Sequence, residues 1–123
     1  MTAGLCLLLA AGLTTLPAQN FTLSWTHSVE KTEWREVWRV TPEGLVAMEA
    51  RVKGSGAGMD PPEGSVLRDG WWVWTPNLPP LPELVLAASG ATGAGWTLCA
   101  ASQCLELGAQ AGEAIQIRPC AAQ

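Results

Sequence analysis

The stretch Phe21–Val40, FTLSWTHSVEKTEWREVWRV, decides the fold because it is typical of two amphipathic strands joined by a turn. Over the first strand, expected at Phe21–Val29, apolar or aromatic residues alternate with Thr and Ser. This period of two indicates a strand with one buried face. The second strand, expected at Trp34–Val40, alternates in the same way. The stretch therefore predicts an antiparallel hairpin with an apolar, tryptophan-rich face.

The hairpin predicts a close pair of ionisable groups. A four-residue loop, Glu30–Glu33, keeps the apolar sets of both strands on one face, and it places His27 opposite Glu36 and Trp25 opposite Trp38. Ionisable groups on an apolar face are costly unless something compensates them. We therefore expect His27 and Glu36 to be cross-strand neighbours, either as a structural pair that fixes the hairpin or as a ligand contact or proton-transfer site.

The rest of the chain favours further short strands, since 13 Gly and 9 Pro favour turns over helices. A third strand is expected over Leu45–Lys53, with Val46, Met48, Ala50 and Val52 facing inward. Others are expected at Ser65–Leu67, Trp71–Trp74, Leu84–Ser89, Trp96–Cys99, Cys104–Leu107 and Ala114–Ile117. The proline-rich Thr75–Pro82 is expected to run extended along the surface. The predicted fold class is all-β, a small antiparallel β-sandwich or open barrel of about seven to nine short strands.

The chain of 123 residues has room for one domain. The apolar run within residues 1–18 is shorter than the roughly 20 residues that span a bilayer, but it has the length of the apolar region of a signal peptide. Residues 1–18 are therefore expected to be a signal peptide. A buried strand or helix is the alternative interpretation. Residues 19–107 are expected to form a β-rich domain, and residues 108–123 a C-terminal extension that can add one edge strand. This division predicts a periplasmic or secreted protein that does not itself span the membrane.

The charge content argues against one class of partner, and the cysteine content predicts a disulfide. The formal net charge of −4 and only seven Lys plus Arg argue against nucleic-acid binding. Cys99 and Cys104 flank a four-residue loop between two strand-like runs, which predicts a disulfide across a hairpin. A metal site is the alternative there, although its spacing is loose. Cys120 has no obvious partner if Cys6 leaves with a signal peptide. No metal or other cofactor is expected.

A glycine-rich loop and a tryptophan run indicate a surface for binding. The loop GSGAG at Gly54–Gly58 either lets the backbone approach a partner closely or is a flexible turn. Trp72 and Trp74 share one strand face and Trp71 takes the other, so at least one indole should be partly exposed. No catalytic residue is assigned. The candidate binding residues are His27, Glu30, Glu36, Gly54, Gly56, Gly58, Met59, Trp71 and Trp72.

From Leu23 to about Leu107 the chain resembles the bacterial family called domain of unknown function 1850. The resemblance rests on Trp25–Thr32, Glu36-x-Trp38, Lys53–Met59, Asp69–Trp72, Leu78–Pro82 and the Cys99/Cys104 hairpin. Members of that family are small exported proteins, often encoded beside tripartite periplasmic (TRAP) transporters of the TAXI type. The resemblance implies an accessory role in solute uptake, with the transporter membrane subunit or its solute-binding protein as partner.

Two functions are compatible with these observations. The expected function is that of a non-enzymatic accessory or binding module associated with a TAXI-type TRAP system. The alternative is a metal-dependent or His/Glu-based hydrolase built around His27 with Glu30 or Glu36. His27 and Ser28 are neighbours on a strand and point to opposite faces, so His27 cannot activate Ser28 as a nucleophile. The sequence therefore favours the binding module.

Overall fold

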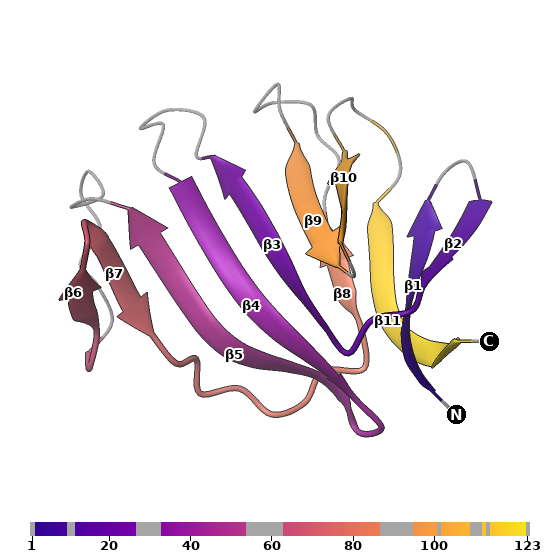
Figure 1. Ribbon diagram of the computed structural model, residues 1–123, viewed down its shortest axis with the longest axis horizontal. Coiled ribbons are helices and arrows are strands. Elements are labelled where there is room, and N and C mark those ends of the chain that lie inside the picture. Colours follow the sequence, from indigo (N-terminus) through magenta and orange to yellow (C-terminus); the bar gives the residue numbers. More distant parts are fainter. Residues whose placement is uncertain are drawn as a thin grey trace.

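A computed structural model describes residues 2–9, 12–26, 33–53, 63–86, 95–100, 102–108, 112 and 114–122. The described residues form eleven strands in two antiparallel sheets of four and seven strands (Figure 1). The predicted all-β class is therefore confirmed, in its two-sheet, sandwich-like form. The number of strands exceeds the prediction because β1 and β2 arise from the expected signal peptide.

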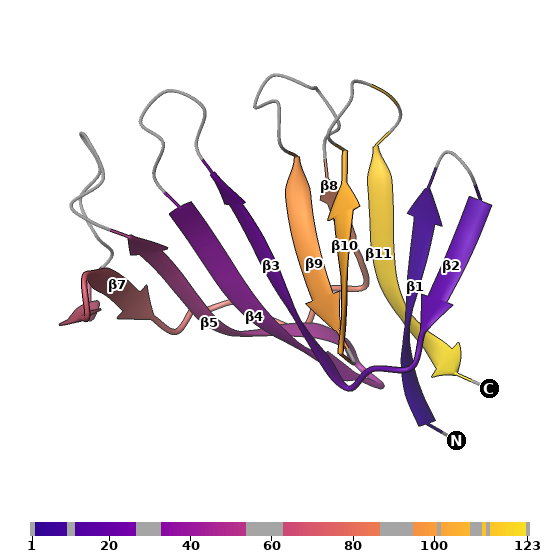
Figure 2. The same ribbon diagram turned by 45° about the horizontal axis from the view of Figure 1, so that its top comes forward.

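The seven-stranded sheet has the order β10-β9-β3-β4-β5-β7-β6. Its members are β3 (Asn20–Thr26), β4 (Glu33–Thr41), β5 (Gly44–Lys53), β6 (Val66–Arg68), β7 (Trp71–Trp74), β9 (Trp96–Ala100) and β10 (Gln103–Leu107). All were expected from the sequence with only small differences at their ends. In Figures 1 and 2, β5, β6 and β7 lie on the side of the molecule opposite β1, β2 and β11.

The four-stranded sheet has the order β2-β1-β11-β8. It consists of β1 (Thr2–Leu9), β2 (Gly12–Leu16), β8 (Leu84–Leu86) and β11 (Ile115–Ala122). β11 lies between β1 and β8, so the C-terminal extension contributes an interior strand here and not an edge strand. This sheet therefore joins the two ends of the chain.

The hydrophobic core is built from both sheets. Leu5 and Leu7 of β1 and Ile117 of β11 are fully buried, together with Leu23 of β3 and Leu98 of β9. All belong to one cluster, and no described polar or charged residue is buried. We call the side of the seven-stranded sheet that carries Leu23 and Leu98 the inner face, and the opposite side the outer face.

The N-terminal segment takes part in this core. Leu5 and Leu7 are 0% exposed, and β1 pairs with β2 on one side and with β11 on the other. Cleavage after Ala18 stays a prediction, and it would remove both strands from this sheet. Apolar composition alone does not separate the two interpretations, because a short apolar run suits both a signal peptide and a buried strand.

The register of the first hairpin corrects the predicted one. Trp25 lies opposite Trp34 and not Trp38, and Leu23, not His27, lies opposite Glu36. The face of each strand is as expected, because the shift between the two registers is even and preserves the alternation. The observed register pairs large aromatic groups with each other: Phe21 is stacked with Trp38 at 6.4 Å between ring centroids.

A β-bulge corrects the expected inward set of β5. The register shifts between Val37 and Trp38, so that Val37 lies opposite Glu49 and Trp38 opposite Ala47. Met48, the extra residue, is 43% exposed, and Ala47 is buried in its place. One extra residue resets the alternation of a strand. Ala50 and Val52 are therefore inward as expected, whereas Met48 and Val46 are not.

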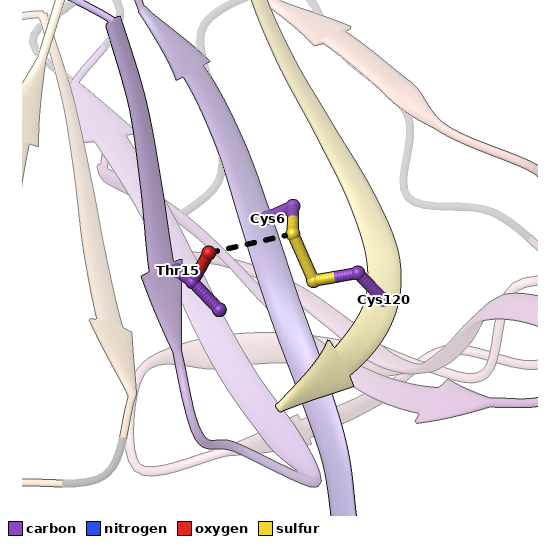
Figure 3. Close-up of a disulfide and its surroundings, with 3 residues drawn as sticks. All are labelled: Cys6, Thr15 and Cys120. Carbon is purple, nitrogen blue, oxygen red and sulfur yellow. Dashed lines mark hydrogen bonds between the residues drawn. A yellow bond between two sulfur atoms is a disulfide. The ribbon is translucent and has the colours of Figure 1, made fainter. Parts of the chain in front are cut away.

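Two disulfides link pairs of strands. The predicted bond between Cys99 and Cys104 is confirmed, and it joins directly opposed residues of β9 and β10. The second links Cys6 of β1 to Cys120 of β11, with an S–S distance of 2.02 Å and a sequence separation of 114 (Figure 3). The Thr15 hydroxyl lies 3.7 Å from the Cys6 sulfur and is the donor, because a disulfide sulfur carries no proton.

Candidate functional site

The structure describes three of the candidate binding residues and places two of them on the inner face and one on the outer face. Trp72 lies opposite Val52, and Val52 lies opposite Trp34. Trp34 in turn lies opposite Trp25, which shares its strand face with Leu23. Trp72 is therefore on the inner face. Glu36, opposite Leu23, is on the inner face too, whereas Trp71 pairs with Lys53 on the outer face. The prediction that Trp71 and Trp72 point to opposite sides is confirmed. The candidates outside the described residues are His27, Glu30, Gly54, Gly56, Gly58 and Met59.

Four tryptophans form a connected row on the inner face, which we call the indole row: Trp96, Trp25, Trp34 and Trp74. Trp25 is stacked on Trp34, with ring centroids 5.9 Å apart and planes 7° apart. Trp96 contacts the other side of Trp25 at 4.7 Å, and Trp74 meets Trp34 edge-on at 6.3 Å. Offset-stacked and edge-to-face arrangements are the favourable ones for aromatic rings. The row therefore crosses strands β9, β3, β4 and β7 as one ordered unit.

Most of the indole row lies outside the main core. Trp25, Trp34 and Trp74 are half-buried and do not belong to the core cluster, and Trp96 packs against its edge. Large aromatic groups that are ordered but only partly buried are typical of contact surfaces. Trp25 was expected on this face from the alternation, but the row itself was not, because it depends on the true register of the hairpin.

Glu36 lies beside the indole row. It is opposite Ala50 of β5, which is in turn opposite Trp74 of β7. The indole nitrogen of Trp38 donates a hydrogen bond of 3.0 Å to Oε1 of Glu36. Burial raises the pKa of Glu36 above its ordinary value, and the hydrogen bond from Trp38 opposes this shift. Glu36 is therefore a carboxyl group held in a partly apolar, aromatic environment.

The outer face carries a different arrangement, centred on Trp71. The charged groups of Arg35, Arg51 and Lys53 lie 5.1, 5.7 and 5.6 Å from the centroid of the Trp71 ring. Cations over an indole face at such distances are attracted by its quadrupole. The outward positions of β4 and β5 could have revealed this cluster, because their arginines and lysine share one parity in the sequence.

Two hollows lie on the outer face, on the side of β3, β9 and β10. One, of about 260 Å³, is lined by Thr22, Val37 and both cysteines of the Cys99–Cys104 disulfide, among others. The other, of about 220 Å³, has Ser24, Glu33 and Glu106 in its lining. Among the described residues no three His, Cys, Asp or Glu side chains come close enough to hold a metal ion.

These features define a small two-sheet β-domain with an aromatic inner surface and a charged outer one. Over residues 21–107 the chain matches the family described as Domain of unknown function (DUF1850), and it belongs to that family. No curated protein and no solved structure matches it. The matched region covers β3 to β10, so β1, β2 and β11 lie outside it.

Two observations bear on location. The two disulfides fit an oxidising, extracellular compartment, because intracellular reductants keep most thiols reduced. The described residues contain no helix of the length and apolar character that crossing a membrane requires.

Proposed function

We propose that this protein is an exported, non-enzymatic accessory module of a TAXI-type TRAP solute uptake system, and that the indole row is its contact surface. The observation that carries the proposal is that Trp25 stacks on Trp34 and Trp74 meets Trp34 edge-on, all three outside the main core. Half-exposed tryptophans offer large apolar area at low conformational cost, which is why they are enriched in binding surfaces.

The position of the row supports this role. Thr26 and Glu33 form the last pair of β3 and β4, and Lys53 at the end of β5 pairs with Trp71. The segments with the other candidate residues, His27 and Gly54–Met59, follow directly after Thr26 and Lys53 in the chain. Trp25 and Trp34 therefore lie near the ends of β3 and β4 that are joined through the segment containing His27.

The association with TRAP transport rests on the family. Membership of the DUF1850 family implies this association, and the two disulfides support a periplasmic location. The partner is the membrane subunit of the transporter or its solute-binding protein, and the solute itself is a further candidate for contact with the indoles. The support that the Cys99–Cys104 disulfide gives to an oxidising compartment is independent of the fate of residues 1–18, because both cysteines lie beyond them.

Co-purification tests the proposal. Tagged protein is isolated from the cell envelope of its own host, and TRAP subunits are identified by mass spectrometry. The wild type should recover one of them, and Trp34→Ala should recover clearly less, since it removes the central ring of the row. Val85→Ala is the matched control, because it truncates an apolar side chain that is 57% exposed on the other sheet.

The outcomes separate the two parts of the proposal. Absence of every TRAP subunit from the wild-type sample would remove the transport association. Equal recovery with Trp34→Ala, in a sample that circular dichroism shows to be folded, would remove the indole row as the contact surface.

A further inference from the structure

The outer side of strands β4 to β7 concentrates the positive charge of the chain. We call it the basic face. Five of the seven Lys and Arg residues lie there against two carboxylates, a formal charge of +3, while the whole chain carries −4. Its members are Arg35, Arg39, Arg51, Lys53, Arg68, Glu33, Glu49 and Trp71. Asp69 lies in the adjoining turn between β6 and β7.

The strand register packs these cations closely. Arg35 lies directly opposite Arg51, and Trp71 lies between Lys53 of β5 and Arg68 of β6. Like charges directly opposite each other destabilise a sheet. The Trp71 ring offsets part of this repulsion, because three cations lie within 6 Å of its centroid. The cluster is thus organised around one indole.

The carboxylates on this face neutralise only part of the cluster. Glu33 forms an ion pair of 2.9 Å with Arg35, and Glu49 forms one of 2.6 Å with Arg51. The ion pairs between described residues leave Lys53, Arg68 and Arg39 without a carboxylate. An acidic partner would therefore meet positive groups that the described part of the chain does not already satisfy.

We propose that the basic face docks an acidic segment of a partner protein. Arginine forks match the geometry of carboxylates, and electrostatic complementarity gives such docking its specificity and speed. On the same face of the edge strand β6 as Arg68, Val66 is 51% exposed. A polypeptide can place carboxylates on the cations and an apolar side chain on Val66 at the same time.

A protein partner fits this face better than a lipid surface does. Tryptophans that anchor a protein at a bilayer need a ring that reaches the acyl boundary. Trp71 is instead half-buried, with the charged groups of Arg35, Arg51 and Lys53 over its ring. The face therefore presents hydrogen-bond donors and not a projecting indole.

Binding of a fluorescein-labelled oligoglutamate peptide to the full chain, followed by fluorescence anisotropy, tests the proposal. Lys53→Glu and Arg68→Glu should each weaken binding by about fivefold or more, and high salt should weaken the wild type, because exposed charges are screened. The matched control is Arg118→Glu, which makes the same charge change at an exposed position of β11. It should change binding less than about twofold. Thermal unfolding of each variant shows that it is folded.

Three results would overturn the proposal. Equal weakening by all three variants would show that only net charge matters. Binding to phosphatidylglycerol vesicles that Lys53→Glu abolishes, without binding of the peptide, would assign the face to a membrane. Self-association in sedimentation that Lys53→Glu abolishes would assign it to a second copy of the chain. The measurement involves no TRAP protein, so its failure leaves the indole-row proposal standing.

Discussion

A disulfide joins Cys6 of β1 to Cys120 of β11, although the two residues are not directly opposite each other. In the strand register, Cys6 lies opposite Arg118 and Cys120 lies opposite Gly4. The bond thus fixes the register of two strands that come from opposite ends of the chain. Cys6 is 8% exposed, and its neighbours Leu5 and Leu7 lie in the core. Loss of residues 1–18 would remove the disulfide partner of Cys120 and one of the two strands that pair with β11, leaving β8 as the other.

We therefore expect Cys6 to remain in the mature protein. Non-reducing digestion of protein from the cell envelope, followed by mass spectrometry, should give one pair of linked peptides that contain Cys6 and Cys120. A mature chain that starts at Gln19, with Cys120 open to alkylation, would contradict this expectation and support cleavage after Ala18.

The two disulfides should differ in what they contribute to stability. Replacing Cys6 and Cys120 by Ser should lower the free energy of unfolding by about 5 kcal/mol, because the bond closes a chain separation of 114 residues. The same change at Cys99 and Cys104, which are five residues apart, should cost about 2 kcal/mol on the same chain-entropy argument. Denaturant unfolding measures both. Losses of equal size would show that loop closure does not govern these bonds.

The register of the β3–β4 hairpin predicts which tryptophans are coupled. A double-mutant cycle with Trp25→Ala and Trp34→Ala should give an interaction energy of about 0.5–1.5 kcal/mol, since the two rings are stacked. The cycle for Trp25 and Trp38, the pair expected from a four-residue loop, should give a value near zero. The reverse result would restore the register predicted from the sequence and separate Trp25 from Trp34.

The alternation of residues along each strand predicted which face a side chain takes, but it did not predict which residues of neighbouring strands lie opposite each other. The faces of β3 and β4 were predicted, because a period of two is local and survives any even shift of register. The partner of Trp25 was not predicted, since two registers with the same parity bury the same residues. The bulge at Met48 likewise cannot be predicted from the sequence of one strand, because a bulge is defined by how that strand pairs with its neighbour, here at Val37 and Trp38.

The candidate site was found only in part for a related reason. Trp71 and Trp72 were predicted to take opposite strand faces with at least one indole partly exposed, and the structure places them on opposite faces, both half-buried. Their partners come from β4 and β5, and non-local contacts of this kind follow from sheet order, which local patterns do not give. The disulfide of Cys6 was missed because the partner strands β1 and β11 lie at opposite ends of the sequence.

Glu36 should make stability depend on pH. Burial raises its pKa in the folded state, so the folded protein binds more protons than the unfolded one between the ordinary and the raised value. The contribution to stability is therefore fully present below the ordinary pKa, about 4.5, and is lost as pH rises through the folded pKa. Glu36→Gln keeps an acceptor for Trp38, and it should unfold at higher denaturant concentration than the wild type at pH 7.

Denaturant unfolding between pH 4 and pH 7 checks this prediction, because Glu36→Gln should flatten the pH dependence relative to the wild type. The comparison variant is Glu43→Gln, which removes a carboxyl group from an exposed turn. Equal flattening in both variants would argue against a particular effect of the partly buried Glu36.

Gly44 should tolerate no side chain, because it lies where β5 meets the proline-rich segment. Leu45 and Leu81 exchange two backbone hydrogen bonds of 2.7 and 2.8 Å, and a Cβ on Gly44 would lie 2.5 Å from the Leu81 carbonyl oxygen. Its φ of +135° is also unfavourable for any residue with a side chain. Gly44→Ala should therefore lower the free energy of unfolding by about 3 kcal/mol or more, from backbone strain plus overlap with fixed backbone atoms.

The control for this change is Gly70→Ala, in the turn between β6 and β7. Gly70 has a φ of +86°, yet nothing lies within 4 Å of the added Cβ. Its replacement should cost only the backbone strain, about 1–2 kcal/mol. Denaturant unfolding of the two variants thus separates strain from overlap, and a similar loss in both would mean that Leu81 moves away freely. In that case the proline-rich segment would not be held to β5 by the Leu45–Leu81 bridge.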